Sequence, residues 1–150
     1  MSHHLAQLNI ARLLAPLDSP QLAEFVGNLE RINALAERSP GFVWRFQTEA
    51  GDATADRSFG EDIVANLSVW DSVEALHAYV YRSDHAPIMA RRRSWFAQPS
   101  EPWSVLWWVP AGHRPSMTEA AERLQALREH GPGPQAFTFK QAFPAPTAVV

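Results

Sequence analysis

Polar and apolar residues alternate along two segments of the chain, residues 5–12 and 62–70. A period of two places successive side chains on opposite faces of a β-strand, so both segments are predicted to be strands. In the first, Leu8 and Ile10 alternate with Gln7 and Asn9, which predicts one apolar face and one amide-bearing face. The second segment has Ile63, Ala65, Leu67 and Val69 on one face and Val64, Asn66, Ser68 and Trp70 on the other.

Three further segments are predicted to be extended. Residues 42–46 form a strand in which Phe42, Trp44 and Phe46 share one face. Residues 104–109 are almost entirely apolar and stop at Pro110, a pattern typical of a strand buried on both faces. Residues 137–139 follow a break rich in Gly and Pro and form a short final strand.

Apolar residues recur at steps of three and four between these strands, which predicts amphipathic helices. The first helix begins after Ser19, a candidate N-cap, has Pro20 at its first position and ends near residues 39–41. The second follows a cap at Asp71 or Ser72. Their predicted inward residues are Leu22, Phe25, Val26, Leu29, Ile32 and Leu35 in the first helix and Val73, Leu76, Tyr79 and Val80 in the second.

Two more helical segments complete the pattern. One follows residues 84–87 and runs to about Phe96, and the other is a surface helix over residues 117–129. The inward positions of the surface helix are Ala120, Ala121, Leu124 and Leu127.

The order strand, helix, strand, strand, helix, strand predicts an α+β, ferredoxin-like fold, with an antiparallel sheet and helices on one face. The other face then carries rows of Phe, Trp and Val without a cover. Large exposed apolar patches indicate a partner. We therefore expect a homodimer in which two sheets pack face to face as a barrel.

Composition narrows the function classes. The chain has 150 residues with 13 basic against 16 acidic ones, a formal net charge of −3 and no Cys. This predicts one domain over residues 1–150, with a loose proline-rich tail from about residue 144. The small net charge creates no strong electrostatic field that would attract nucleic acid. No apolar run approaches the ~20 residues that a membrane-spanning helix needs. The absence of Cys excludes thiolate metal sites. We expect a cytoplasmic protein with no nucleic-acid or membrane partner.

Several motifs resemble a known family over about residues 5–140. They are Ser39–Arg45, Trp70–Leu76, Asp84–Pro87 with Arg93–Phe96, Leu106–Pro115, Gly131–Pro132 and Ala136–Phe139. Together they resemble the domain-of-unknown-function family 3291, a branch of the dimeric α+β barrel superfamily. That superfamily also holds the antibiotic-biosynthesis monooxygenases and several haem proteins, so the resemblance implies a fold but no settled activity.

The first candidate site is a row of polar side chains on the predicted strands. Asn66, Ser68 and Trp70 share a face, and Gln7, Asn9 and Arg45 lie on neighbouring strands. Amide donors and a guanidinium can hold an enolate or phenolate oxygen as its charge develops. The spacing of Asn66 and Trp70 resembles that of an Asn and a Trp on a central strand of cofactor-independent monooxygenases. The alternative is an ordinary hydrogen-bonded sheet face with Trp70 in the core.

The second candidate is His85, at a turn before a helical face that carries Met89, Arg92 and Phe96. It can serve as a general base or as a haem axial ligand, with the arginines of residues 91–93 pairing the propionates. The alternative is a packed loop histidine beside a solvated arginine face. His113 and Arg114 either close over a site or are simply exposed. The histidines are scattered along the sequence, so we expect no metal site.

We therefore predict a small-molecule enzyme of the antibiotic-biosynthesis-monooxygenase type, without a cofactor, acting on an apolar aromatic or polyketide-like substrate. His85 is the acid or base, and Asn66 and Arg45 hold an oxyanion. The predicted substrate-binding residues are Trp70, Ser68, Asn9, Trp44, Met89, Arg92 and Trp108. Two alternatives stay open, a haem protein with His85 as axial ligand and a non-catalytic module that binds a hydrophobic ligand.

Overall fold

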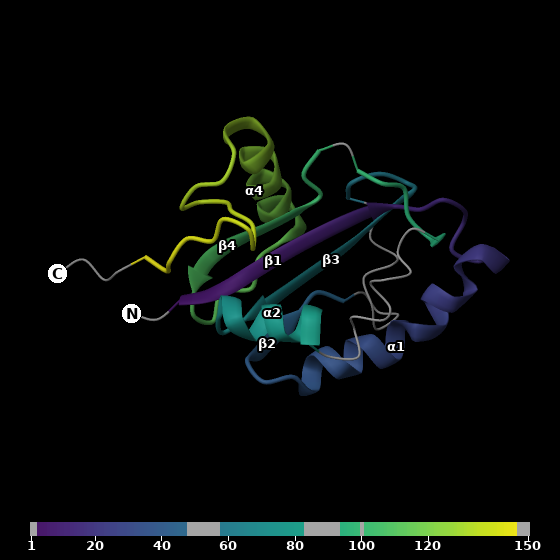
Figure 1. The fold of residues 1–150 in the computed structure, drawn as a ribbon, viewed down its shortest axis with the longest axis horizontal. Coiled ribbons are helices and arrows are strands. Elements are labelled where there is room, and N and C mark those ends of the chain that lie inside the picture. The colour runs from purple at the N-terminus through teal and green to yellow at the C-terminus, as the bar shows by residue number, and fades with distance from the viewer. Residues whose placement is uncertain (1–2, 48–57, 83–93, 100, 147–150) are drawn as a thin grey trace.

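The structure, a computed structural model, describes residues 3–47, 58–82, 94–99 and 101–146. Four strands form one antiparallel sheet in the order β2-β3-β1-β4. Figure 1 shows α1 and α2 on the β2–β3 side of the molecule and α4 beside β4. The elements are β1 (His3–Arg12), η1 (Pro20–Leu22), α1 (Ala23–Arg38), β2 (Phe42–Arg45), β3 (Ile63–Trp70), α2 (Val73–Arg82), β4 (Ser104–Pro110) and α4 (Met117–His130).

Strand β1 lies at the centre of the sheet and sets its register. It pairs with β3 from Leu5 opposite Trp70 to Arg12 opposite Ile63, and with β4 from His3 opposite Pro110 onward. Successive β1 residues face opposite sides, so the amide-bearing face of β1 lies beside the polar face of β3. The predicted alternation in both strands is confirmed, and so is the antiparallel α+β fold.

Strand β2 departs from the prediction. Phe42 lies opposite Trp70 whereas Trp44 lies opposite Val69, with a shift in register between them. Such a bulge places an extra residue in one strand and turns the following side chains to the other face. The prediction that Phe42 and Trp44 share a face is therefore wrong, and Arg45, opposite Ser68, lies on the polar face.

One apolar core lies between the sheet and α4. The inward side of α4 buries Met117, Ala120, Leu124 and Leu127 against the sheet. The sheet side of this core consists of Ala6, Leu8, Ile10, Ile63, Ala65, Leu67, Val69, Val105, Trp107 and Val109. The sequence predicts helices on one face only, whereas α4 also packs on the second face, over β4 and β1. The homodimer stays a prediction.

The second core lies between the opposite sheet face and helices α1 and α2. Its buried residues are Leu5, Ala36, Trp70, Leu76, Tyr79, Leu106 and Phe137. Phe137 forms an isolated antiparallel bridge to Leu106, so residues 137–139 are not the strand that the sequence predicts. The C-terminal segment instead covers β4 on this face, where Trp108 Nε1 donates to the Phe143 carbonyl oxygen at 2.8 Å.

Side-chain caps mark the start of α2 and α4 but not of η1 and α1. Ser72 caps α2, because its Oγ accepts from the Ala75 amide at 3.0 Å. Ser19 precedes η1 and Pro20 begins it, but the Ser19 side chain makes no capping bond. The predicted helical segment after residues 84–87 lies mostly outside the described residues. In the described part of the chain, no helix is long and apolar enough to span a bilayer.

Candidate functional site

A row of polar side chains crosses the sheet face that packs against α1 and α2. Gln7 lies opposite Ser68, and Asn9 lies opposite Asn66. These four residues come from two adjacent strands whose alternation turns them to the same side. The structure therefore brings together the polar residues that the sequence predicts, and Gln7, Asn9, Asn66 and Ser68 form an amide row.

Hydrogen bonds order this amide row. Gln7 Nε2 donates to Asn66 Oδ1 at 2.6 Å and to Ser68 Oγ at 2.7 Å. Gln7 and Ser68 are buried, whereas Asn9 and Asn66 are exposed. Buried amides and hydroxyls need such partners, because an unsatisfied polar group in the interior costs about 1–3 kcal/mol. The buried Gln7 thus holds the exposed Asn66 side chain in place.

Trp70 ends the row inside the core. Its side chain is 1 % exposed, and its Nε1 donates to Ser68 Oγ at 2.9 Å. Its ring lies 5.0 Å from that of Tyr79 and 5.4 Å, edge to face, from that of Phe42. Trp70 therefore packs within the second core and contacts the amide row through Ser68.

Arg45 places a positive charge on the same face. Its side chain is 12 % exposed, and Nε lies 3.3 Å from Glu37 Oε2 of α1. Tyr79 lies nearby, and its hydroxyl donates to the Ile32 carbonyl oxygen at 3.2 Å. Burial raises the pKa of Tyr79, and the charge of Arg45 partly opposes that rise. Arg45 is thus tied between α1 and β2 beside the amide row.

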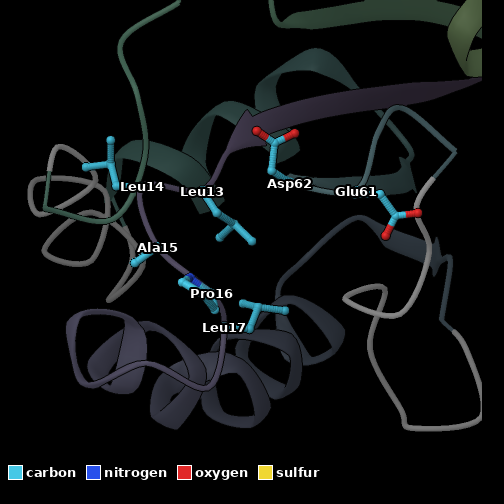
Figure 2. A pocket seen from close by; sticks show the side chains of 7 residues that line it. All are labelled: Leu13, Leu14, Ala15, Pro16, Leu17, Glu61 and Asp62. Atoms are coloured by element: carbon cyan, nitrogen blue, oxygen red, sulfur yellow. The ribbon is translucent and has the colours of Figure 1, made fainter.

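An apolar hollow lies where β1 ends and the chain turns toward α1. Its volume is about 420 Å³, and Leu13, Leu14, Ala15, Pro16, Leu17, Glu61 and Asp62 line it. Figure 2 shows Leu13, Pro16 and Leu17 in the space between β1 and the helix below it, with Asp62 above them. Asp62 Oδ2 also lies 3.3 Å from Arg12 Nε. The hollow offers an apolar surface with carboxylates at its edge.

Two of the predicted substrate-binding residues lie away from the amide row. Trp44 faces the α4 side of the sheet, and the Arg114 guanidinium carbon lies 5.9 Å from its ring centroid. Trp108 lies on the amide-row side but on β4, where the C-terminal segment covers it. Two others, Met89 and Arg92, lie outside the described residues, as do the predicted acid or base His85 and the arginines Arg91 and Arg93.

His113 belongs to a contact on the opposite side of the sheet. Its Nε2 lies 2.7 Å from Glu119 Oε1, and Glu119 Oε2 accepts from Trp107 Nε1 at 2.9 Å. Sequence reasoning missed Glu119, although Ser116 and Glu119 have the spacing of a helix-capping motif. It also missed the hollow, whose signal is the apolar run from Leu13 to Leu17. Among the described residues, no cluster of three metal-ligating side chains occurs.

Comparisons with known proteins place the chain in a family and a fold. A family model described as domain of unknown function (DUF3291) matches residues 4–150. SnoaB from Streptomyces nogalater, described as a cofactor-independent oxygenase, is 17 % identical with a TM-score of 0.50, covering 75 % of this chain and 97 % of SnoaB. NE2512 from Nitrosomonas europaea, a protein of unknown function, is 17 % identical with a TM-score of 0.51, covering 76 % of this chain and 96 % of NE2512. A search of curated proteins finds no match.

Proposed function

The chain belongs to the DUF3291 family, and we propose that it is a small-molecule enzyme of the cofactor-independent oxygenase type. The proposed substrate is an apolar aromatic or polyketide-like molecule with an ionisable hydroxyl group. The fold is similar to that of SnoaB, which is described as such an oxygenase. A shared fold does not establish an activity, so the support for this activity comes from the site.

One observation carries the proposal. The Asn66 amide is exposed on the sheet face, and its oxygen already accepts a bond from Gln7 Nε2. The Asn66 Nδ2 group therefore points away from Gln7 and can donate to a bound ligand. A fixed donor of this kind stabilises negative charge that develops on a substrate oxygen.

The proposed reaction uses that donor at one step. A base removes the hydroxyl proton of the substrate, and Asn66 Nδ2 donates to the resulting enolate or phenolate oxygen. The electron-rich ring then reduces dioxygen at an activated CH2 carbon. Two hydrogens leave that carbon, one oxygen atom joins it as a carbonyl, and the other oxygen leaves as water. Arg45, opposite Ser68 on the same face, adds positive charge, and His85 is the proposed acid or base.

The apolar hollow supports an apolar substrate. Its volume of about 420 Å³ lies within the range of small-molecule pockets, roughly 300–1,000 Å³. Leu13 and Leu17 offer apolar contact in the hollow, which lies beyond the exposed end of the amide row along β1. The proposal also includes a homodimer, which is expected from the family resemblance. Sedimentation velocity measures the oligomeric state and so tests it.

Oxygen consumption with a panel of hydroxyanthrones, which carry both an ionisable hydroxyl and an activated CH2 carbon, tests the function. We expect turnover by the wild-type protein and a loss of about 10²–10³-fold in kcat for Asn66→Ala. Asn66→Asp, which keeps the size but replaces the outward donor with an acceptor, should lose as much. Gln125→Ala on the exposed side of α4 is the matched control and should keep full turnover.

The outcomes separate the proposal from its main alternative. Unchanged turnover in both Asn66 variants, with an intact fold by circular dichroism, would contradict the role of Asn66. Binding of several panel members without oxygen consumption or substrate loss would instead support a non-catalytic module that binds hydrophobic ligands.

A further inference from the structure

We propose that Gln7 is a positioning residue that sets the hydrogen-bond polarity of the amide row. By holding Asn66 in one orientation, Gln7 makes the site select ligands that present an acceptor oxygen, such as an aryl ketone or a phenolate. This inference rests on the proposed function only in taking the amide row as the ligand-binding face. The orientation itself follows from the contacts of the described residues.

The contacts of Gln7 determine which end of its amide faces Asn66. Gln7 Nε2 lies 3.5 Å from the main-chain oxygen of Asn66 and 2.6 Å from Asn66 Oδ1. A main-chain carbonyl oxygen can only accept hydrogen bonds. The nitrogen of the Gln7 amide, and not its oxygen, therefore suits this position.

The orientation of Asn66 follows from that of Gln7. An amide nitrogen that donates needs an acceptor opposite, so Asn66 turns Oδ1 toward Gln7 and Nδ2 away from it. Among the described residues, Nδ2 of Asn66 has no hydrogen-bond partner, and the side chain is exposed. The group that Asn66 presents outward is a donor, and its natural ligand is an acceptor.

Burial makes this arrangement costly to reverse. Gln7 is 8 % exposed and Ser68 is 6 % exposed, so neither side chain can replace a lost partner with bulk water. Ser68 Oγ accepts from both Gln7 Nε2 and Trp70 Nε1, and an indole N–H can only donate. Trp70 thus anchors Ser68 from the core, and Ser68 in turn holds Gln7 beside Asn66.

Two matched probes test the selection. They are 1-acetylnaphthalene, which presents an acceptor, and 1-aminonaphthalene, which presents donors, with naphthalene as the apolar reference. We expect the wild-type protein to bind the ketone more tightly than the amine by about 3- to 10-fold, the effect of one hydrogen bond. Equal affinities, or binding of neither probe, would overturn the selection.

Variants of Gln7 test whether this residue causes the preference for the ketone. Gln7→Met removes the donor, and Gln7→Asn keeps an amide opposite Ser68 but is one methylene too short to reach Asn66. In both variants the ketone and the amine should bind with equal affinity. The affinity for naphthalene should stay within about twofold of the wild-type value. Gln125→Met on α4 is the control and should keep the wild-type ratio of ketone to amine affinity. A wild-type ratio in Gln7→Asn, the milder substitution for the fold, would contradict the proposal.

Side-chain amide exchange with solvent, measured by NMR, tests the orientation without a ligand. The Gln7 amide protons should be protected, and those of Asn66 should exchange rapidly. Protection of the Asn66 protons would show that Asn66 donates to Gln7 and would overturn the inference. This result does not depend on turnover, so a failure of the proposed oxygenase activity and a failure of the Gln7 inference are distinguishable.

Discussion

The indole Nε1 of Trp107 donates to Glu119 Oε2 at 2.9 Å, which joins strand β4 to the first turn of helix α4. Trp107 is fully buried, so its N–H depends on this carboxylate. Glu119 also receives support from its own helix, because its amide donates to Ser116 Oγ at 3.1 Å. A single residue therefore couples the cap of α4, through its amide, to the core beneath it, through its carboxylate.

Glu119→Ala should lower the free energy of unfolding by about 1–3 kcal/mol, because it leaves the Trp107 N–H buried without a partner. Glu119→Gln keeps an acceptor oxygen and should cost clearly less. Urea denaturation followed by tryptophan fluorescence measures both. Equal losses in the two variants would show that the carboxylate charge, and not the bond to Trp107, stabilises this contact.

The turn before β2 requires Gly41. Its φ is +85°, and a Cβ there would lie 2.5 Å from Ala75 Cβ and from Asp71 Oδ1. We expect Gly41→Ala to cost about 3 kcal/mol or more, from steric overlap added to backbone strain. Gly112→Ala is the control with φ +91° and open space, and it should cost only the strain, ~1–2 kcal/mol.

Gly27 completes this series as a position where alanine should help. It lies inside α1, and a Cβ there meets nothing within 4 Å. Gly27→Ala should stabilise the protein by about 0.5–1 kcal/mol, since glycine lowers helix stability. Thermal unfolding should rank the three variants from most to least stable as Gly27→Ala, Gly112→Ala and Gly41→Ala. A Gly41→Ala variant as stable as Gly112→Ala would contradict the predicted steric overlap.

Stability should fall at alkaline pH because of Tyr79. Burial raises the pKa of this phenol above its ordinary value of 10.0. Above pH 10 the unfolded chain loses the proton while the folded chain keeps it, so the free energy of unfolding decreases as pH rises. The slope from this group is at most about 1.4 kcal/mol per pH unit.

Tyr79→Phe should remove that decrease, although it also loses the bond to Ile32 and so starts from a lower stability. Tyr81→Phe, at a side chain that is 57 % exposed, is the matched control and should keep the wild-type profile. Denaturant unfolding between pH 8 and 11 checks this, and an unchanged alkaline slope in Tyr79→Phe would assign the decrease to other groups.

The proposed chemistry requires no cofactor, so the purified protein should show no Soret band and its turnover should survive a metal chelator. Visible absorption and a haemin titration measure this directly. A Soret band that saturates at one haemin per chain and disappears in His85→Ala would instead support the haem alternative.

Much of the fold could be predicted from local sequence patterns. The alternation in β1 and β3 assigns Gln7, Asn9, Asn66 and Ser68 to one face, and the structure keeps them there. This succeeds because a strand has a period of two wherever it lies in the sheet. The helical spacing of α1 and the cap of α2 are likewise determined by neighbouring residues.

The remaining features depend on contacts between distant parts of the chain. The bulge in β2 separates Phe42 from Trp44 through pairing with β3, and no local pattern signals that shift. The apolar side of α4 is equally compatible with either sheet face, and in the structure it packs on the face of Trp107, where Glu119 accepts from the indole.

The sequence by itself determined which residues share a face in β1 and β3, the type of each long element and the amide row. Only the tertiary structure decided that Trp70 is buried behind Ser68, that Trp44 faces α4 and that Gln7 orients Asn66. The physical reason is that periodicity is set by backbone geometry within one segment. Register, burial and hydrogen-bond direction are instead set by which segments pack together.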